Sequence, residues 1–369
     1  MSVLKKCCAA VAVTLSVISF SQAQAEEEKV LNVYNWSDYI AADTLERFTK
    51  ETGITVNYDV YDSNEMLEAK LMAGKSGYDV VFPTALPFVA NQIKAGIYLP
   101  LDETKLPNMA NIEDGVAASL NKADPELLKH AVPYMIAGTG VAYNVDKVNE
   151  LAPGAPLDSW SLIFNPEWAK KLSSCGISLL DDPTEVFAAA MVYLGKDPKS
   201  EDPADLKAAS GAIEAIRPYI RYFHSSTNIN DMANGDLCVS HGYGGDLIQA
   251  RDRAIEANNG VNVVVFLPKE GAQVVIDVMA IPADAPHPEN AKKFIDFMMR
   301  ADVVGPITDA VGYANAIKGS TEFVSKERQA DPVIYPSEET RNAFFSLPPK
   351  SRGYMRQMTR EWTRLKTNQ

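Results

Sequence analysis

Residues 30–39 read VLNVYNWSDY, an apolar run followed directly by an acid that stands between two aromatic residues. The apolar run predicts the first strand of the exported chain, with Trp36-Ser37-Asp38-Tyr39 at its end. A carboxylate beside ring faces is suited to an organic cation, because it neutralises an ammonium while the rings cover the attached methylenes. The alternative is that the rings enter the core and Ser37 or Asp38 begins a helix, and the stretch taken alone favours that interpretation.

Strand and helix patterns alternate along the rest of the chain. Strands are predicted at 30–36, 54–61, 78–83, 131–136, 139–144, 177–181, 237–243, 261–268 and 274–282, and helices at 43–52, 63–73, 87–95, 184–195, 203–217, 246–258, 290–300, 337–346 and 353–366. Short strands separated by single helices predict an α/β fold with mainly parallel sheets. A chain of about 340 residues after the N-terminal segment is long for one core and suits two lobes.

The N-terminal segment predicts export. Residues 1–25 have a basic start at Lys5 and Lys6, an apolar stretch, and a small-residue cleavage site at 23–25, as expected for a cleaved signal peptide. Without the two lysines, which are the segment's only charged residues, the formal net charge moves from −13 to −15. This charge argues against nucleic acid and anionic membrane surfaces as partners and favours cationic ligands.

Two cysteines, Cys175 and Cys238, remain after residue 25. A pair of cysteines in an oxidising compartment predicts one disulfide, worth on the order of 4 kcal/mol if it is unstrained. Two buried free thiols are the alternative.

Three acids outside the opening stretch are further candidates. Asp277 interrupts the apolar run 274–281, where an unpaired carboxylate is costly to bury, so it needs a cation or several hydrogen-bond donors. A structural arginine is the alternative to a ligand cation. Asp246 opens a predicted helix three residues after Tyr243, which repeats the pairing of an aromatic with an acid, although Asp is also a favoured helix N-cap. Glu185 lies in the first turn of another predicted helix, where it can simply complement the helix dipole.

The sequence contains no recognised catalytic or metal-binding motif. The four histidines are scattered, and the sequence contains no His-Glu-x-x-His, paired-cysteine, Gly-x-Ser-x-Gly or phosphate-loop motif. An enzyme interpretation therefore has no residue to rest on, and no cofactor or metal is expected.

Seven segments together resemble the periplasmic polyamine-binding proteins of ABC importers, and most closely their putrescine-binding branch. The segments are 35–40 (NWSDYI), 58–65 (YDVYDSNE), 70–74 (KLMAG), 143–148 (YNVDKV), 221–226 (RYFHSS), 267–272 (LPKEGA) and 312–316 (GYANA). Each is short, but their order covers essentially the whole exported chain.

The resemblance implies a type II periplasmic binding protein fold, with two hinge-linked lobes that each contain a mixed sheet. The implied lobes are 26–136 plus 262–322 and 137–261 plus 323–369. The implied ligand-binding residues are Trp36, Ser37, Asp38, Tyr39, Thr84, Glu185, Tyr243, Asp246, Val275, Asp277 and Tyr313, and the implied disulfide joins Cys175 and Cys238. Among these, Asp38 and Asp277 would hold ammonium groups at one end of the ligand and Asp246 the other end.

The resemblance further implies a monomeric periplasmic receptor that delivers a polyamine, putrescine first, to a membrane ABC permease. Val275, His241 and Thr84 depart from the branch's pattern and leave the choice among putrescine, cadaverine, agmatine and spermidine open. The alternative from a different class is an exported hydrolase acting on a cationic substrate.

Overall fold

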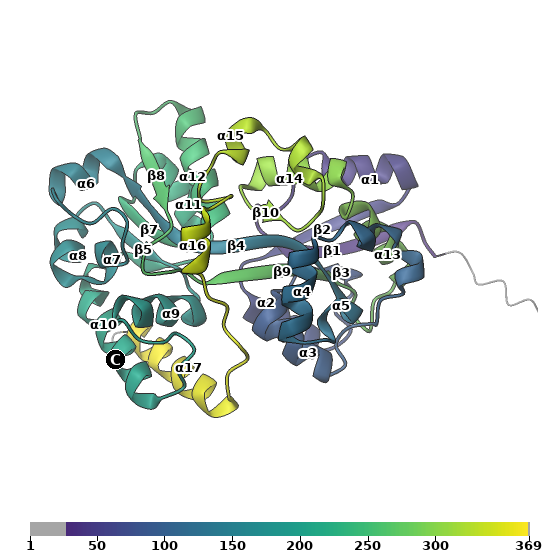
Figure 1. Ribbon diagram of the computed structural model, residues 1–369, viewed down its shortest axis with the longest axis horizontal. Coiled ribbons are helices and arrows are strands. Elements are labelled where there is room, and N and C mark those ends of the chain that lie inside the picture. The colour runs from purple at the N-terminus through teal and green to yellow at the C-terminus, as the bar shows by residue number, and fades with distance from the viewer. Residues whose placement is uncertain (1–26, 368–369) are drawn as a thin grey trace, which may run out of the picture.

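The computed structural model of this protein describes residues 27–367 (Figure 1). The predicted signal peptide, residues 1–25, lies outside the described residues. Within 27–367, none of the helices is both long and apolar enough to cross a membrane.

The described chain forms ten strands, paired in the order β2-β1-β3-β9-β4-β7-β5-β6, with β8 and β10 also paired to β4. The strands are β1 (Val30–Trp36), β2 (Thr55–Tyr61), β3 (Val80–Val81), β4 (Ala131–Asn144), β5 (Ile177–Leu179), β6 (Tyr222–Phe223), β7 (Val239–Tyr243), β8 (Val263–Phe266), β9 (Val274–Ala280) and β10 (Ala314–Asn315). The pattern predicted β1 at its observed bounds.

Strand β4 belongs to both lobes of the molecule. Its first part, Ala131–Gly138, pairs with β9, and its second part, Thr139–Asn144, pairs with β7 and β8. Figure 1 shows β4 and β9 running between the two groups of elements. We call the group around β1, β2, β3 and β9 the N-terminal lobe and the group around β5, β6, β7 and β8 the C-terminal lobe.

The sheet is mixed in both lobes. β1 pairs in parallel with β2 and β3, and β5 pairs in parallel with β6 and β7, whereas every pairing of β4 and β9 is antiparallel. The expectation of mainly parallel sheets is wrong at the centre, because β4 and β9 are crossing strands rather than members of strand–helix–strand units. The two strands predicted at 131–136 and 139–144 form one continuous strand.

The helices are α1 (Thr44–Thr52), α2 (Asn64–Met72), α3 (Ala90–Lys94), α4 (Asp114–Ala123), α5 (Leu127–His130), α6 (Val145–Leu151), α7 (Ser161–Phe164), α8 (Pro166–Leu172), α9 (Pro183–Tyr193), α10 (Pro203–Ile216), α11 (Thr227–Asn234), α12 (Gly244–Ala257), α13 (Pro288–Met298), α14 (Ala301–Val311), α15 (Lys326–Gln329), α16 (Glu338–Asn342) and α17 (Arg352–Thr367). Side-chain caps fix several starts: Asp182 caps α9, and Ser63 caps α2.

Helices cover both faces of each lobe's sheet. In β1, Leu31 and Val33 pack on the core that includes α1, α13 and α14, whereas Tyr34 packs on the core that includes α2 and α5. In β4, Val141 and Ala142 divide in the same way between two cores of the C-terminal lobe. Successive strand residues point to opposite faces, so each of these strands contributes side chains to two cores.

The disulfide between Cys175 and Cys238 is present, with the two Cα atoms 5.5 Å apart. The division at residue 262 remains a prediction. Because β8 pairs with the second part of β4, a boundary after β8 would keep this strand with its sheet partner.

Candidate functional site

A cavity lies between the two lobes, where β1, β4, β7 and β9 meet. It is lined by Trp36, Ser37, Tyr39, Tyr61, Asp62, Asn64, Thr84, Leu86, Pro87, Phe88, Ala137, Asp182, Thr184, Glu185, Ser225, Ser226, Tyr243, Asp246, Gln273, Val275, Asp277 and Tyr313. The cavity volume is about 50 Å³, which is room for a few ordered waters or a slender chain.

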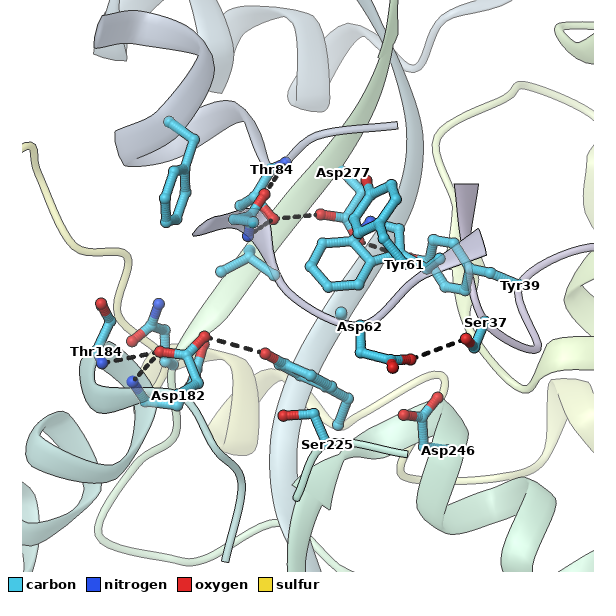
Figure 2. Close-up of a pocket in the computed structure, with 18 of the residues that line it drawn as sticks. Ser37, Tyr39, Tyr61, Asp62, Thr84, Asp182, Thr184, Ser225, Asp246 and Asp277 are labelled. Carbon is cyan, nitrogen blue, oxygen red and sulfur yellow. Dashed lines mark hydrogen bonds between the residues drawn. The ribbon is translucent and has the colours of Figure 1, made fainter. Parts of the chain in front are cut away.

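Among the described residues, the cavity lining is acidic and includes no lysine, arginine or histidine. Its five carboxylates are Asp62, Asp182, Glu185, Asp246 and Asp277. Across residues 27–367, none of the five forms an ion pair with a lysine, arginine or histidine. Asp182, Asp246 and Asp277 approach the cavity from three sides (Figure 2). Buried carboxylates without cations are costly, so this cavity is suited to a cationic ligand.

Asp277 is held by two hydroxyl groups. The Thr84 hydroxyl donates to one carboxylate oxygen at 2.6 Å and the Tyr39 hydroxyl donates to the other at 2.8 Å. Asn64 in turn donates from its side chain to the Thr84 hydroxyl at 3.0 Å. Burial raises the pKa of Asp277 to about 6, although both hydrogen bonds act in the opposite direction. The structural arginine considered from the sequence is not present beside Asp277 in the described chain.

Asp246 lies in the first turn of α12 and is held from the other lobe. The Tyr313 hydroxyl donates to its carboxylate at 2.7 Å, and the Asp246 backbone N–H donates to the same hydroxyl oxygen at 3.2 Å. Burial raises the pKa of Asp246 to about 7, against the effect of the Tyr313 hydrogen bond. The sequence alternative of an ordinary N-cap does not apply, because Tyr243 rather than Asp246 occupies the cap position of α12.

Asp182 and Glu185 form the acidic side of the cavity at the start of α9. Asp182 accepts hydrogen bonds from the backbone N–H groups of Thr184 and Glu185 at 2.8 and 3.2 Å, and from the Tyr243 hydroxyl at 3.1 Å. Glu185 is 3 % exposed, and its Oε2 atom has no hydrogen-bond partner among residues 27–367. Burial raises the pKa of Glu185 well above its usual range, and the neighbouring Asp182 carboxylate raises it further.

Aromatic rings enclose the space between these acids. Trp36 lies with its ring centroid 4.7 Å from that of Tyr61 and 6.3 Å from that of Tyr243, and its indole N–H donates to the Phe82 carbonyl at 2.7 Å. The rings of Tyr39 and Tyr313 meet edge to face at 5.0 Å. Rings that are fixed in this way offer faces to a cation and to methylene groups.

The structure brings together ten of the eleven residues that the resemblance named. These ten line the cavity: Trp36, Ser37, Tyr39, Thr84, Glu185, Tyr243, Asp246, Val275, Asp277 and Tyr313.

The placement predicted for Asp38 is corrected. Its backbone has φ of 53°, and its carboxylate forms an ion pair with Arg253 at 2.7 Å. Asp38 does not line the cavity.

Asp62, at the end of β2, was not singled out from the sequence. Its Oδ1 accepts a hydrogen bond from the Ser37 hydroxyl at 2.8 Å (Figure 2). The same oxygen accepts a second one from the Ser226 hydroxyl at 2.7 Å, which joins the two lobes. The sequence signal for Asp62 was its position after a predicted strand, which is also the position of Asp38. Asp182 and Gln273 were also missed, since an N-cap and a lone glutamine carry no motif.

His241 does not reach the cavity. Its ring is fully buried and meets the Trp160 ring edge to face at 5.2 Å, and neither ring nitrogen has a hydrogen-bond partner in the described part of the chain. The expectation that His241 influences ligand choice directly therefore has no contact to support it. In residues 27–367, no group of three or more His, Cys, Asp or Glu side chains is arranged to hold a metal ion.

Residues 43–335 match the family model of the bacterial extracellular solute-binding proteins. The chain belongs to this family. It is 51 % identical over 357 residues to a putrescine-binding periplasmic protein, SpuD, of Pseudomonas aeruginosa, covering 96 % of this chain and 97 % of that relative. It is also 51 % identical over 345 residues to the putrescine-binding periplasmic protein PotF of Escherichia coli, covering 93 % of each chain.

The fold of this solute-binding protein is also found among solved structures. A putative spermidine/putrescine ABC transporter protein from Listeria monocytogenes superposes with a TM-score of 0.80 at 26 % identity, covering 92 % of this chain and all of the other. The predicted two-lobed α/β fold is thereby confirmed, and the family is one of solute-binding transport proteins.

Proposed function

We propose that this protein is an extracytoplasmic receptor that binds a polyamine, putrescine first, between its lobes and delivers it to a membrane ABC permease. The observation that carries the proposal is the set of five cavity carboxylates with no basic partner in the described chain. The named ligands of the two relatives at 51 % identity support putrescine as the first candidate.

The chemistry of a diamine fits the division of the cavity. A diamine has two ammonium groups separated by methylenes, so it needs acids at both ends and an apolar middle. Asp277 and Asp246 would hold the two ammonium groups, and Trp36, Tyr39 and Tyr313 would cover the chain between them. An amine with a single charge would leave one buried acid unpaired, at a cost of roughly 1–3 kcal/mol or more.

Delivery follows from closure of the lobes on the ligand. The Asp62–Ser226 and Asp246–Tyr313 hydrogen bonds join opposite lobes at the cavity, so ligand and closure are coupled there. A closed shape that forms with the ligand inside gives a permease a surface to recognise. We further propose a monomer in the periplasm. We propose no chemical step for it, because the chain belongs to a family of solute-binding proteins.

Calorimetry of the ligand-free protein lacking residues 1–25 tests the function. Putrescine, cadaverine, agmatine and spermidine are titrated in turn, with 1-aminobutane as the matched control that lacks only the second ammonium of putrescine. We expect at least one polyamine to bind tightly and 1-aminobutane to bind far more weakly. Binding of every polyamine weaker than about 100 μM, or about −5.5 kcal/mol, would contradict the proposal, and formation of a product would favour a hydrolase.

A further inference from the structure

The start of β9 forms one side of the cavity. Gln273 directly precedes β9, lines the cavity and is 4 % exposed, yet none of residues 27–367 donates a hydrogen bond to its side-chain oxygen. Glu185 lines the same cavity with its own unpartnered oxygen. Unpartnered buried acceptors are rare because each one costs about 1–3 kcal/mol. Two in one cavity indicate that donors from a ligand complete them.

Thr139 brings these two acceptors into one neighbourhood. Its backbone N–H donates to the Gln273 carbonyl at 3.1 Å, and its hydroxyl partly offsets the raised pKa of Glu185 by hydrogen bonding. Thr139 also stands opposite Tyr243 in the β4–β7 pairing. Directly opposed residues of an antiparallel pair share a face, so Thr139 and Tyr243 both face the acidic side of the cavity.

The inward face of β9 places polar groups at a fixed spacing along the cavity. Gln273, Val275 and Asp277 alternate along the strand and all three line the cavity, whereas Val274 and Ile276 between them do not. The face therefore presents an amide, an apolar group and a carboxylate in that order. The Cα atoms of Gln273 and Asp277 are about 13 Å apart, at about 3.3 Å per residue.

The separation of Gln273 and Asp277 distinguishes polyamines by the distance between their terminal nitrogens. With single bonds of about 1.5 Å, the nitrogens of an extended four-carbon diamine are about 6 Å apart, and the terminal nitrogens of a triamine with three and four carbons between its amines are about 11 Å apart. A diamine held at Asp277 stops short of Gln273. A triamine held there reaches it, since side chains and hydrogen bonds span the remaining distance.

We propose that Gln273 adds its side-chain oxygen to the Glu185 end of the cavity, remote from Asp277, and thereby determines how well the protein binds a triamine. A primary ammonium has three N–H groups, and this end offers the free oxygens of Gln273 and Glu185 beside the Asp182 carboxylate. The charge of the cavity agrees, because a third ammonium neutralises more of the five carboxylates than a diamine can. This inference rests on the proposed function and extends it.

The test compares Gln273→Leu with the unaltered protein, using spermidine and putrescine in separate titrations. We expect Gln273→Leu to weaken spermidine binding by about tenfold or more, because a hydrogen bond to a charged donor is lost, and putrescine binding to change by less than about twofold. The melting temperature of the ligand-free protein should not fall, since the substitution removes an unpartnered buried group. Gln273→Glu keeps the acceptor and adds charge, so spermidine binding should be retained or strengthened.

Several outcomes would overturn the inference. Equal weakening of both ligands together with a lower melting temperature would make Gln273 a structural residue. Unchanged spermidine binding in Gln273→Leu, or loss of it in a folded Gln273→Glu, would remove Gln273 from the site. An unaltered protein that binds putrescine but not spermidine would refute the triamine site and leave the receptor function standing, whereas one that binds neither would refute the function itself.

Discussion

Asp277 carries the strongest residue-level prediction, because it is 5 % exposed and, within the described residues, has two hydroxyl donors but no basic partner. Asp277→Asn keeps the shape of the side chain and removes its charge. We expect the affinity for putrescine to fall by roughly 2–3 kcal/mol, or about 30- to 150-fold, through loss of a charge-assisted hydrogen bond. Titration calorimetry measures this change.

Asp38→Asn is the matched control for Asp277→Asn. It makes the same chemical change in an acid that lies outside the cavity and pairs with Arg253 where both side chains are partly exposed. Such a pair contributes about 0–1 kcal/mol, so affinity should change little. A loss in Asp38→Asn as large as that in Asp277→Asn would contradict the placement of the two acids.

His241 gives a residue-level prediction for stability. Burial lowers the pKa of His241 to about 3, whereas an unfolded histidine titrates near 6.5. As the pH falls below about 6.5, only the unfolded chain takes up this proton, so the free energy of unfolding decreases by about 1.4 kcal/mol per pH unit until about pH 3. His241→Leu should remove this slope and, at pH 7, raise the free energy of unfolding by about 1 kcal/mol.

Urea unfolding of both proteins at several pH values between 4 and 7 measures the His241 effect. His224→Leu is the control, because His224 is exposed and its Nδ1 accepts hydrogen bonds from the N–H groups of Ser226 and Thr227. The same loss of slope in His224→Leu, or an unchanged slope in His241→Leu, would contradict the explanation.

Single residues could be predicted where local sequence already states an energetic problem. Asp277 stands in an apolar strand and must find a partner, and that requirement is visible without a structure. The predicted placement of Asp38 was wrong because the turn after β1 takes a left-handed backbone, which no local sequence pattern indicates. Asp62 and Gln273 were missed because their neighbours, Ser226 and Thr139, are distant in the sequence and meet them only in the fold.

At the scale of elements, strand and helix patterns gave most of the segments that build the site. Strand β1 and helix α17 were predicted within one residue of their bounds, because each has a clear apolar period. The helix predicted at 337–346 is only Glu338–Asn342, and α14 was not predicted, because Pro306 interrupts its pattern. Strand pairing cannot be predicted from local sequence patterns, so only the structure shows that both lobes share β4.

The start of α12 gives a prediction for an element. A Cβ atom at Gly245 would lie 2.1 Å from the Tyr313 ring, and a ring held in a core cannot move as a flexible side chain does. Gly245→Ala should therefore displace Tyr313 from Asp246, reduce polyamine affinity by roughly tenfold or more and lower stability by about 1–3 kcal/mol. Calorimetry and urea unfolding measure the two effects.

Gly211→Ala in α10 is the matched control for Gly245→Ala. A Cβ atom at Gly211 meets nothing within 4 Å, so alanine should leave affinity unchanged and raise stability by about 0.5–1 kcal/mol through helix propensity. If Gly245→Ala binds putrescine as the unaltered protein does, close packing at the start of α12 is not required for the site.

At the scale of the whole molecule, the site exists only where the lobes meet. Asp277, Thr84 and Tyr39 come from the N-terminal lobe, whereas Asp182, Glu185 and Asp246 come from the C-terminal lobe, and the two sets share one cavity. Closure removes both sets of acids from water together. The raised pKa values of Asp246 and Asp277, to about 7 and about 6, follow from this common burial.

This shared burial predicts that polyamine binding depends on pH. An ammonium group favours the charged carboxylates, so binding below about pH 7 must displace protons from Asp246, and below about pH 6 from Asp277 as well. The affinity for putrescine should be constant above about pH 8 and fall as the pH decreases, by up to about tenfold per pH unit for each proton displaced.

Calorimetry between pH 5 and 8, in buffers of different ionisation enthalpy, counts the protons that are released on binding. Putrescine itself stays doubly charged over this range, so the change reports on the protein. Asp277→Asn serves as the control, because it should release about one proton fewer near pH 5.5 while retaining the step near pH 7 that belongs to Asp246. An affinity that stays level from pH 8 to pH 5 would mean that both carboxylates are already charged before the ligand arrives, and that closure does not bury them as a unit.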